Sequence, residues 1–307
     1  MQLSKYKNPL LLFITALIWG TAFVAQSQGM DYVDPYTFNA VRNMLGALAL
    51  VPVIIVIDKM QPAGQKTKDP VQRKNLLIGG TLCGIVLCAA SNLQQFGIQM
   101  GSEVGKAGFI TACYIIIVPL LGLFIKKKCP PTVWLGVVLA VVGLYLLCIK
   151  ENFYIQSSDI LIFLCAIFFA VHILVIDKYT MLVSGIKMSC IQFFVCGLLS
   201  GVLMLIFEDP QLSHIIAAWK PIVYTGVFSC GVAYTLQIVG QRGVNPTVAS
   251  LILSLESVIS VLAGWIILNQ ELGSRELIGC GFMFIAIILV ECLPPNFFKK
   301  LFSKSIK

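Results

Sequence analysis

The sequence predicts an all-α integral membrane protein in which ten transmembrane helices form two inverted five-helix repeats around a central cavity. Three observations carry this prediction: an apolar composition, ten apolar runs of membrane-spanning length, and a polar pattern that recurs in the second half. Of the 307 residues, 58% are hydrophobic and only 12% are charged. Soluble domains average about 45–50% apolar and about 25% charged residues, so the natural solvent of this chain is lipid.

The number of membrane passes follows from the length of the apolar runs. A helix needs about 20 apolar residues to span the hydrocarbon core. Each run must be helical, because every backbone N–H and C=O group within lipid needs a partner inside the segment. The runs of that length are 9–28, 35–57, 75–99, 104–125, 132–149, 158–177, 185–207, 217–240, 246–268 and 275–293.

Lysine and arginine predict the orientation, since cytoplasmic loops carry an excess of both. With the N-terminus inside, 17 basic residues fall on the inner side and four, Lys106, Lys150, Lys220 and Arg275, on the outer side. We therefore expect a multi-pass protein of the plasma (inner) membrane with both termini in the cytoplasm. The formal net charge of +8 arises from these connecting segments, so no nucleic-acid partner is expected.

Eleven cysteines lie mostly inside the apolar runs, without a C-x-x-C pair or a Cys/His cluster. Buried, reduced thiols that act as small apolar side chains are the interpretation that fits this placement. Neither a metal nor a cofactor is expected.

The two halves resemble each other when the sequence is shifted by 142 residues. The coinciding pairs include Gln95 with Gln237, Gln99 with Gln241, and Gly101 with Gly243. Because each half would have an odd number of helices, the second half must enter the membrane from the opposite side, as in many secondary transporters. We place the first repeat at 1–149 and the second at 150–307, which ends in a short basic tail.

Four stretches, in their order and spacing, are typical of one family of carriers. They are ALIWG at 16–20, PYTFNAVR at 35–42, VGKAGFIT at 104–111 with Pro119, and ASLILSLE at 249–256 with Glu271. On these stretches the chain resembles, over essentially its whole length, the EamA branch of the drug/metabolite transporter superfamily. The resemblance implies a substrate cavity walled by helices 1, 3, 4, 6, 8 and 9, and alternating access. One departure is that lysines occupy 126–128, where many members keep an acidic residue.

Ionisable groups inside the runs are the first candidates for the transport pathway, because a charge at mid-bilayer costs at least about 2.5–3.5 kcal/mol. Glu256, near the middle of the ninth run, is a proton-coupling group or substrate contact, or else a protonated acid bonded to a neighbouring helix. His172 in the sixth run is a proton relay or a helix–helix hydrogen bond. Arg42 in the second run binds a substrate carboxylate, snorkels to the interface or pairs with an acid.

Amide and aromatic side chains complete the candidate site. Asn92, Gln95 and Gln99 share one face of the third run, and Gln237 and Gln241 repeat the pattern in the eighth. Amides both donate and accept hydrogen bonds, so these faces suit zwitterions or sugars, or else join helices to each other.

The aromatic candidates are Trp19 and Tyr114. Trp19 lies ten residues into its run, too deep for an interfacial anchor, and Tyr114 is the repeat partner of Glu256. Pro119, a few residues beyond Tyr114, frees a backbone carbonyl and predicts a kink in the fourth run.

These features predict a secondary active transporter of a small organic metabolite, either an amino acid or a related zwitterionic or neutral compound. The family resemblance implies export as the direction of transport. H+ is the candidate coupling ion. The partners expected are the substrate and the bilayer, in a monomer or weak homodimer. The main alternative is a non-selective channel or facilitator.

An intramembrane enzyme is the remaining alternative. His172 and Asp177 match an H-x-x-x-x-D pattern. They lie about 140° apart around a single helix, however, so they cannot act together. No catalytic activity is expected.

Overall fold

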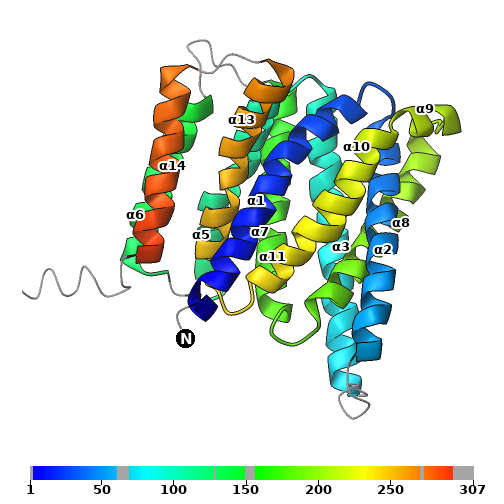
Figure 1. Cartoon of the computed structure of the whole chain (residues 1–307), viewed down its shortest axis with the longest axis horizontal. Helices are drawn as coiled ribbons and strands as arrows, with labels where there is room; N and C mark the ends of the chain where they lie inside the picture. The colour runs from blue at the N-terminus through cyan, green and yellow to red at the C-terminus, as the bar shows by residue number, and fades with distance from the viewer. Residues whose placement is uncertain (1–2, 61–68, 128, 149–155, 270–272, 293–307) are drawn as a thin grey trace, which may run out of the picture.

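The computed structural model describes residues 3–60, 69–127, 129–148, 156–269 and 273–292, which form helices joined by short connections (Figure 1). Within these residues, eight helical segments are long and apolar enough to cross a membrane, and a shorter apolar helix, Pro131–Leu146, accompanies them. The chain is therefore a multi-pass integral membrane protein. Large apolar side chains on the outside, among them Phe124, Leu205 and Ile266, are more than half exposed and face the lipid.

The first half contributes five membrane passes. They are α1 (Leu3–Gly29), α2 (Pro35–Met60), α3 (Pro70–Gln99), an interrupted pass made of α4 (Val104–Ala112) and α5 (Tyr114–Phe124), and α6 (Pro131–Cys148).

The second half repeats this order. Its passes are α7 (Ser157–Tyr179), α8 (Gly185–Phe207), a composite pass of α10 (Trp219–Val223), the π-helical segment η2 (Tyr224–Tyr234) and α11 (Thr235–Gly240), an interrupted pass of α12 (Pro246–Leu253) and α13 (Leu255–Leu268), and α14 (Ser274–Cys292). A short helix, α9 (Leu212–Ala217), precedes the composite pass.

The starts of α3 and α12 are fixed by side chains that satisfy free backbone N–H groups. The Asp69 carboxylate accepts from the Val71 N–H at 3.0 Å. The Asn245 side chain accepts from the Thr247 N–H at 2.9 Å. In both cases a proline follows the capping residue, where its missing N–H costs nothing.

The start of α2 is capped from the other half of the chain. The two oxygens of the Glu208 carboxylate accept from the backbone N–H groups of Tyr36 at 2.8 Å and Thr37 at 2.7 Å. A carboxylate at a helix N-terminus also complements the helix dipole. This contact ties the end of α8 to the beginning of α2.

Two glycines confirm the predicted repeat at the level of the backbone. Gly101 follows α3 with a φ of +90°, and its partner Gly243 follows α11 with a φ of +75°. Nothing would contact a side chain at either position, so the positive φ alone requires glycine there. The pairing seen in the sequence thus reflects a turn that both halves make.

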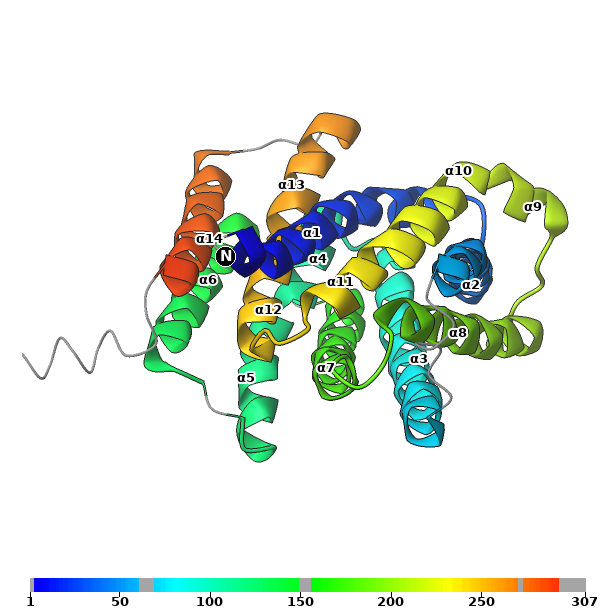
Figure 2. The same cartoon turned by 60° about the horizontal axis from the view of Figure 1, so that its bottom comes forward.

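The halves pack on each other through equivalent helices. Helix α2 packs on α8, α6 packs on α14, α3 packs on α7, and α1 packs on η2 and α13. The α6–α14 pair lies at one end of the molecule and the α2–α8 pair at the other, in both views (Figures 1 and 2). The remaining helices therefore surround the centre, where the largest hydrophobic core cluster includes Trp19 and Tyr114.

The fourth and ninth passes are both interrupted, which the sequence predicts only in part. The interruptions lie at Cys113 and at Ser254, whereas Pro119, where the sequence predicts a kink, lies inside α5. In the ninth pass the Ser254 hydroxyl donates to the Leu251 carbonyl at 2.7 Å. Ser250, Ser257 and Ser260 make the same bond inside α12 and α13 without an interruption, so this bond alone does not account for it.

Candidate substrate-binding site

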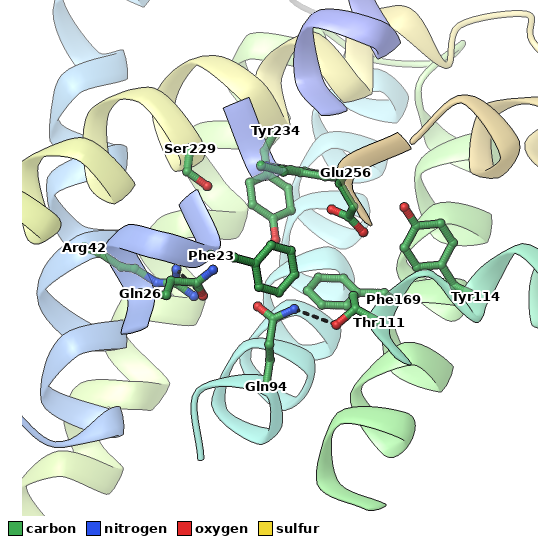
Figure 3. Close-up of a pocket in the computed structure, with 11 residues that line it drawn as sticks. Phe23, Gln26, Arg42, Gln94, Thr111, Tyr114, Phe169, Ser229, Tyr234 and Glu256 are labelled. Carbon is green, nitrogen blue, oxygen red and sulfur yellow. Dashed lines mark hydrogen bonds between the residues drawn. The ribbon is translucent and has the colours of Figure 1, made fainter. Parts of the chain in front are cut away.

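A small cavity of about 30 Å³ lies between the two halves. That volume holds about two water molecules. Its lining comes from seven of the membrane passes: Trp19, Phe23, Gln26, Arg42, Gln94, Thr111, Tyr114, Phe169, Ser229, Tyr234 and Glu256 (Figure 3). The predicted walls of the cavity, helices 1, 3, 4, 6, 8 and 9, are all represented, and α2 adds Arg42.

Arg42 occupies one end of the cavity. Its side chain is 5% exposed, and its Nη1 donates to the Gln26 Oε1 at 3.0 Å. The guanidinium also lies 5.4 Å from the centre of the Phe38 ring, a cation–π distance. The Arg42 Nε has no hydrogen-bond partner among the described residues. A buried guanidinium with a free donor is suited to bind a carboxylate or another anion.

Glu256 occupies the opposite end of the cavity, beside Tyr114 (Figure 3). Its side chain is 3% exposed, and within the described part of the chain its Oε1 has no hydrogen-bond partner. The Tyr114 hydroxyl is likewise without a partner there. Such buried polar groups cost about 1–3 kcal/mol each when they stay unpaired, so this end is suited to bind a proton or a cationic group.

The Glu256 end owes its position to the two interrupted passes. Tyr114 is the first residue of α5 and Glu256 the second residue of α13, so each lies within two residues of its interruption. The carboxyl group of Glu256 and the phenol of Tyr114 therefore extend from equivalent sites of the two repeats.

Aromatic rings form the middle of the cavity. The ring centres of Trp19 and Tyr234 are 4.5 Å apart, at an interplanar angle of 56°. The Tyr234 ring also contacts Phe193 and His172 edge-on, at 5.7 Å and 5.9 Å between ring centres. Phe23 and Phe169 lie between the Arg42 end and the Glu256 end (Figure 3). Polar groups share this stretch, because the Gln94 Nε2 donates to the Thr111 hydroxyl there at 3.1 Å (Figure 3).

His172 lies behind this aromatic wall rather than in the cavity. Its Nε2 forms a 3.0 Å hydrogen bond with the Gln192 Oε1, and its ring is fully buried. The Nδ1 has no partner within the described residues. Through Tyr234 the imidazole is one side chain away from the cavity, so its contacts are those of a helix–helix hydrogen bond.

The predicted amide faces are placed mostly outside the cavity. Gln95 donates from Nε2 to the Gln26 carbonyl at 3.0 Å, which supports Gln26 from behind. Gln99 is exposed at the end of α3 and donates to the Asp34 carboxylate at 3.0 Å. Asn92 belongs to a network that joins α2, α3 and α8, in which it accepts from the Asn39 amide at 2.8 Å.

Gln237 and Gln241 are buried in α11 and at its end. Neither residue lines the cavity. The Gln241 amide has no hydrogen-bond partner among the described residues, and neither has the Gln237 Oε1. Of the ten predicted site residues, the cavity thus brings together Trp19, Arg42, Tyr114 and Glu256.

Sequence reasoning missed Gln26, Gln94 and Tyr234. Gln26 follows Trp19 and Phe23 at i+7 and i+3, which is one helix face, so this pattern was a usable signal. Gln94 is one residue from Gln95, and the choice between them depends on the rotation of α3. Glu271 and Lys128, which entered the family resemblance, lie outside the described residues.

The comparisons with known proteins agree with this architecture. The model of the EamA-like transporter family matches the chain twice, at residues 7–149 and 156–292. An uncharacterized transporter of Archaeoglobus fulgidus is 28% identical over 281 residues, covering 91% of this chain and 84% of its own length. The uncharacterized transporter YoaV of Bacillus subtilis is 22% identical, covering 86% and 89%.

The fold is also known from a crystal structure that covers 98% of this chain and 98% of its own. Its TM-score is 0.71 at 15% sequence identity, a likeness of fold alone. Because the family model matches nearly all of the sequence in two consecutive copies, the chain belongs to the EamA-like transporter family and is a membrane transporter rather than an enzyme.

Proposed function

We propose that the chain is a secondary active transporter that exports an amino acid or a related zwitterionic metabolite by alternating access, with H+ as the coupling ion. The observation that carries the proposal is the pair of buried ionisable groups in one cavity. Arg42 and Glu256 both line it, and no ion pair joins them.

The two groups fit the two charges of a zwitterion. The Arg42 guanidinium has a free Nε donor for a carboxylate, and Gln26 holds its Nη1. The Glu256 carboxylate accepts from an ammonium group. A ligand that supplies both partners would satisfy polar atoms that otherwise stay unpaired, and this gives the cavity a preference for it over neutral compounds.

Coupling follows from competition at Glu256. A protonated carboxyl group no longer attracts an ammonium group, and an ammonium bound to the carboxylate displaces the proton. If proton and cargo occupy Glu256 in turn, cargo moves out as protons move in. An inward proton gradient then drives export through a single shared carboxylate.

The small cavity supports alternating access. A volume of about 30 Å³ cannot hold a metabolite, since ligand pockets measure about 300–1,000 Å³. The two repeats must part for cargo to enter. Parting on one side at a time is the motion that inverted repeats provide.

The remaining features of the proposal concern the membrane, the oligomeric state, the bounds of the repeats and the side on which the termini lie. We propose that the chain lies in the plasma (inner) membrane as a monomer or weak homodimer, with repeats at 1–149 and 150–307. Both termini would be cytoplasmic. Among the described residues, α1 begins and α14 ends on the same side of the molecule, which supports this orientation (Figure 1).

Counterflow in proteoliposomes tests the proposal. Vesicles loaded with an amino acid mixture should take up labelled amino acid against its gradient, with saturation. An imposed pH gradient should drive net movement of cargo. Arg42→Gln should raise the KM by about 10-fold or more, because a hydrogen bond between charged partners contributes about 1.5–3 kcal/mol.

Arg275→Gln is the matched control, since Arg275 lies outside the cavity against the Tyr145 ring. Its KM should be that of the unmodified protein. Uptake that never saturates, or an ohmic current, would mean a channel and would overturn the carrier proposal.

A further inference from the structure

A second cavity lies between the end of α2, the beginning of α3 and the start of α8, and it shares no lining residue with the cavity of Glu256. Its volume of about 370 Å³ falls within the range of about 300–1,000 Å³ that ligand pockets have. Five aliphatic side chains line it together with the polar residues Asp58, Gln72, Arg73, Ser184 and Lys187. This α2–α3–α8 pocket is therefore amphipathic and large enough for a ligand.

The pocket lies at the level where the hydrocarbon core gives way to the headgroups. Asp58 directly follows the apolar run 35–57, and Arg73 lies two residues before the run 75–99. Both belong to the lower ends of α2 and α3 in Figure 1, on the side where α1 begins. Charged side chains just beyond a membrane-spanning run face the headgroup region, which flanks the hydrocarbon core. A ligand of this pocket thus borders headgroups on one side and acyl chains on the other.

The apolar part of the lining continues into the lipid-facing surface. Ile57 of α2 lines the pocket, and its neighbour Val56 is 55% exposed. On α3, Leu76 lines the pocket, and its neighbour Leu77 is 51% exposed. A small free anion gains nothing from aliphatic side chains, whereas an acyl chain buries its methylene groups against them.

The charged lining residues leave one positive charge. The Lys187 Nζ lies 2.8 Å from each oxygen of the Asp58 carboxylate, so these two residues neutralise each other. Arg73 forms no ion pair with another described residue. Its planar guanidinium group is suited to bind a phosphate with two hydrogen bonds. Because Asp58 is already paired, no carboxylate of the lining remains for a cationic headgroup.

We propose that the α2–α3–α8 pocket binds an anionic phospholipid. The phosphate binds Arg73, and an acyl chain lies along Ile57 and Leu76. The Lys187 ammonium group has three donors, of which the two Asp58 oxygens occupy at most two, so one remains for the headgroup. Basic pockets between transmembrane helices are known to bind anionic headgroups. The lining comes from both halves of the chain, so the bound lipid joins α8 to α2 and α3.

Lipid titrations of the purified, delipidated protein in detergent test the proposal. A ligand of the folded form raises the Tm, and the dependence on lipid concentration gives an apparent Kd. We expect phosphatidylglycerol to bind at least 10-fold more tightly than phosphatidylcholine with the same acyl chains. Equal binding of the two lipids would overturn the proposal.

Arg73→Gln should weaken phosphatidylglycerol about 10-fold or more and remove its advantage, because a hydrogen bond between charged partners is lost. Lys74→Gln is the matched control: it removes the same charge from the next residue of α3, which does not line the pocket. Its lipid preference should be that of the unmodified protein. An equal loss in both variants would mean attraction by diffuse surface charge, and the pocket would be wrongly assigned.

Glycerol phosphate, which carries the phosphate without acyl chains, distinguishes a lipid from a soluble anion. It should leave the Tm unchanged at concentrations at which phosphatidylglycerol saturates. An equal Tm shift would mean a site for free phosphate compounds, and the lipid proposal would fall.

Ile57→Ala tests the acyl chain separately. Ile57 lies outside the hydrophobic core clusters of the described residues, so the fold should tolerate the change. Phosphatidylglycerol and phosphatidylcholine should both bind about fourfold more weakly or worse, since one buried methylene group is worth about that factor. Unaltered affinities would contradict an acyl chain in the pocket.

A variant that gains affinity covers the case in which Arg73→Gln does not fold. Asp58→Asn releases Lys187, so phosphatidylglycerol should bind about fivefold more tightly, the effect of one more basic charge near a membrane surface. The Asp58 and Lys187 side chains are 38% and 37% exposed, so loss of their pair costs the fold little. Asp69→Asn is the control, because it removes a carboxylate outside the pocket and asparagine also caps helices. Unchanged or weaker binding by Asp58→Asn would overturn the proposal.

Discussion

The interrupted pass α4–α5 packs on α7, and its counterpart in the second repeat, α12–α13, packs on α1. The two interfaces are related by the repeat, yet they are held differently. Ion pairs bind the first at both ends. The Lys106 Nζ lies 2.7 Å from the Asp159 Oδ2, and the Lys127 Nζ lies 2.6 Å from the Asp177 Oδ2. No ion pair links α12–α13 to α1 among the described residues.

The second interface is held by close packing of small residues. A side chain at Gly20 in α1 would meet the Ile259 side chain and, at 2.8 Å, the Glu256 carbonyl. The serines of the ninth pass face α4 instead, since a side chain at Gly108 would meet the Ser260 hydroxyl. The difference teaches that, of the two interrupted passes, the one without ion pairs to its neighbour carries the Glu256 carboxyl group of the cavity.

The largest expected effect is on the rate of exchange, and it should differ between the repeat partners Glu256 and Tyr114. Glu256→Gln should lower the rate of exchange about 10- to 100-fold and abolish its response to a pH gradient, because a charged hydrogen bond is lost. Tyr114→Phe removes an uncharged hydroxyl that has no hydrogen-bond partner among the described residues, so it should lower the rate less than about 10-fold, with the response kept. Exchange rates across a series of pH gradients in proteoliposomes measure both. A pH response that survives in Glu256→Gln would remove the coupling role.

The next effect concerns the close packing of α1 on α13. Gly20→Ala should destabilise the fold by about 1–3 kcal/mol, because the added methyl group meets backbone and a branched side chain. Gly122→Ala in α5 is the control, since a methyl group there meets only the Lys127 Cβ at 3.7 Å. Denaturant unfolding in detergent compares them. If Gly20→Ala were as stable as Gly122→Ala, the close packing of α1 on α13 would be contradicted.

The two ionic clamps should themselves differ. The Lys106 and Asp159 side chains are 18% and 6% exposed, and those of Lys127 and Asp177 are 47% and 13% exposed. Lys106→Met should therefore cost about 2 kcal/mol, since it leaves a buried carboxylate without its charged donor. Lys127→Met should cost less than about 1 kcal/mol, as exposed pairs do. The reverse order of the two Tm shifts would contradict this assignment.

The smallest expected difference is the one between the two glycine turns, and it tests their symmetry. Gly101→Ala and Gly243→Ala should each cost about 1–2 kcal/mol, because alanine is strained at positive φ and gains no contact. The two losses should agree within about 0.5 kcal/mol, the usual scatter of independent sites. A clear inequality would show that one turn carries an additional constraint.

The helical passes and the repeat could be predicted because lipid leaves the backbone few options. Apolar runs, polar gaps and the glycine pair at 101 and 243 follow directly from that restriction. Glu256, Arg42 and Trp19 could be singled out as cavity residues because the sequence alone shows the charge of a side chain and its depth within an apolar run. The interruption at Ser254 was less accessible, because Ser250, Ser257 and Ser260 of the same pass bond to carbonyls in the same way within continuous helix.

The amide faces show why the rest could not be predicted. Gln94 and Gln95 are neighbours, and which one faces the cavity depends on how α3 rotates against α7 and α8. Gln95 instead donates a hydrogen bond to the Gln26 carbonyl from outside the cavity lining, and no spacing rule reveals such a supporting contact. Gln99 lies beyond the packed part of α3. The helix period groups residues by face, but only the neighbouring helices decide where that face points.

The π-helical segment Tyr224–Tyr234 has no equivalent in α3, where the repeat partner of this stretch is a regular helix. If the two inverted halves were identical, exchanging their conformations would not change the free energy. The outward-open and inward-open forms would then be equally populated at rest. A wider helical turn in one half removes that degeneracy. Under the proposed alternating access, we expect one opening direction to lie lower in energy before any gradient is applied.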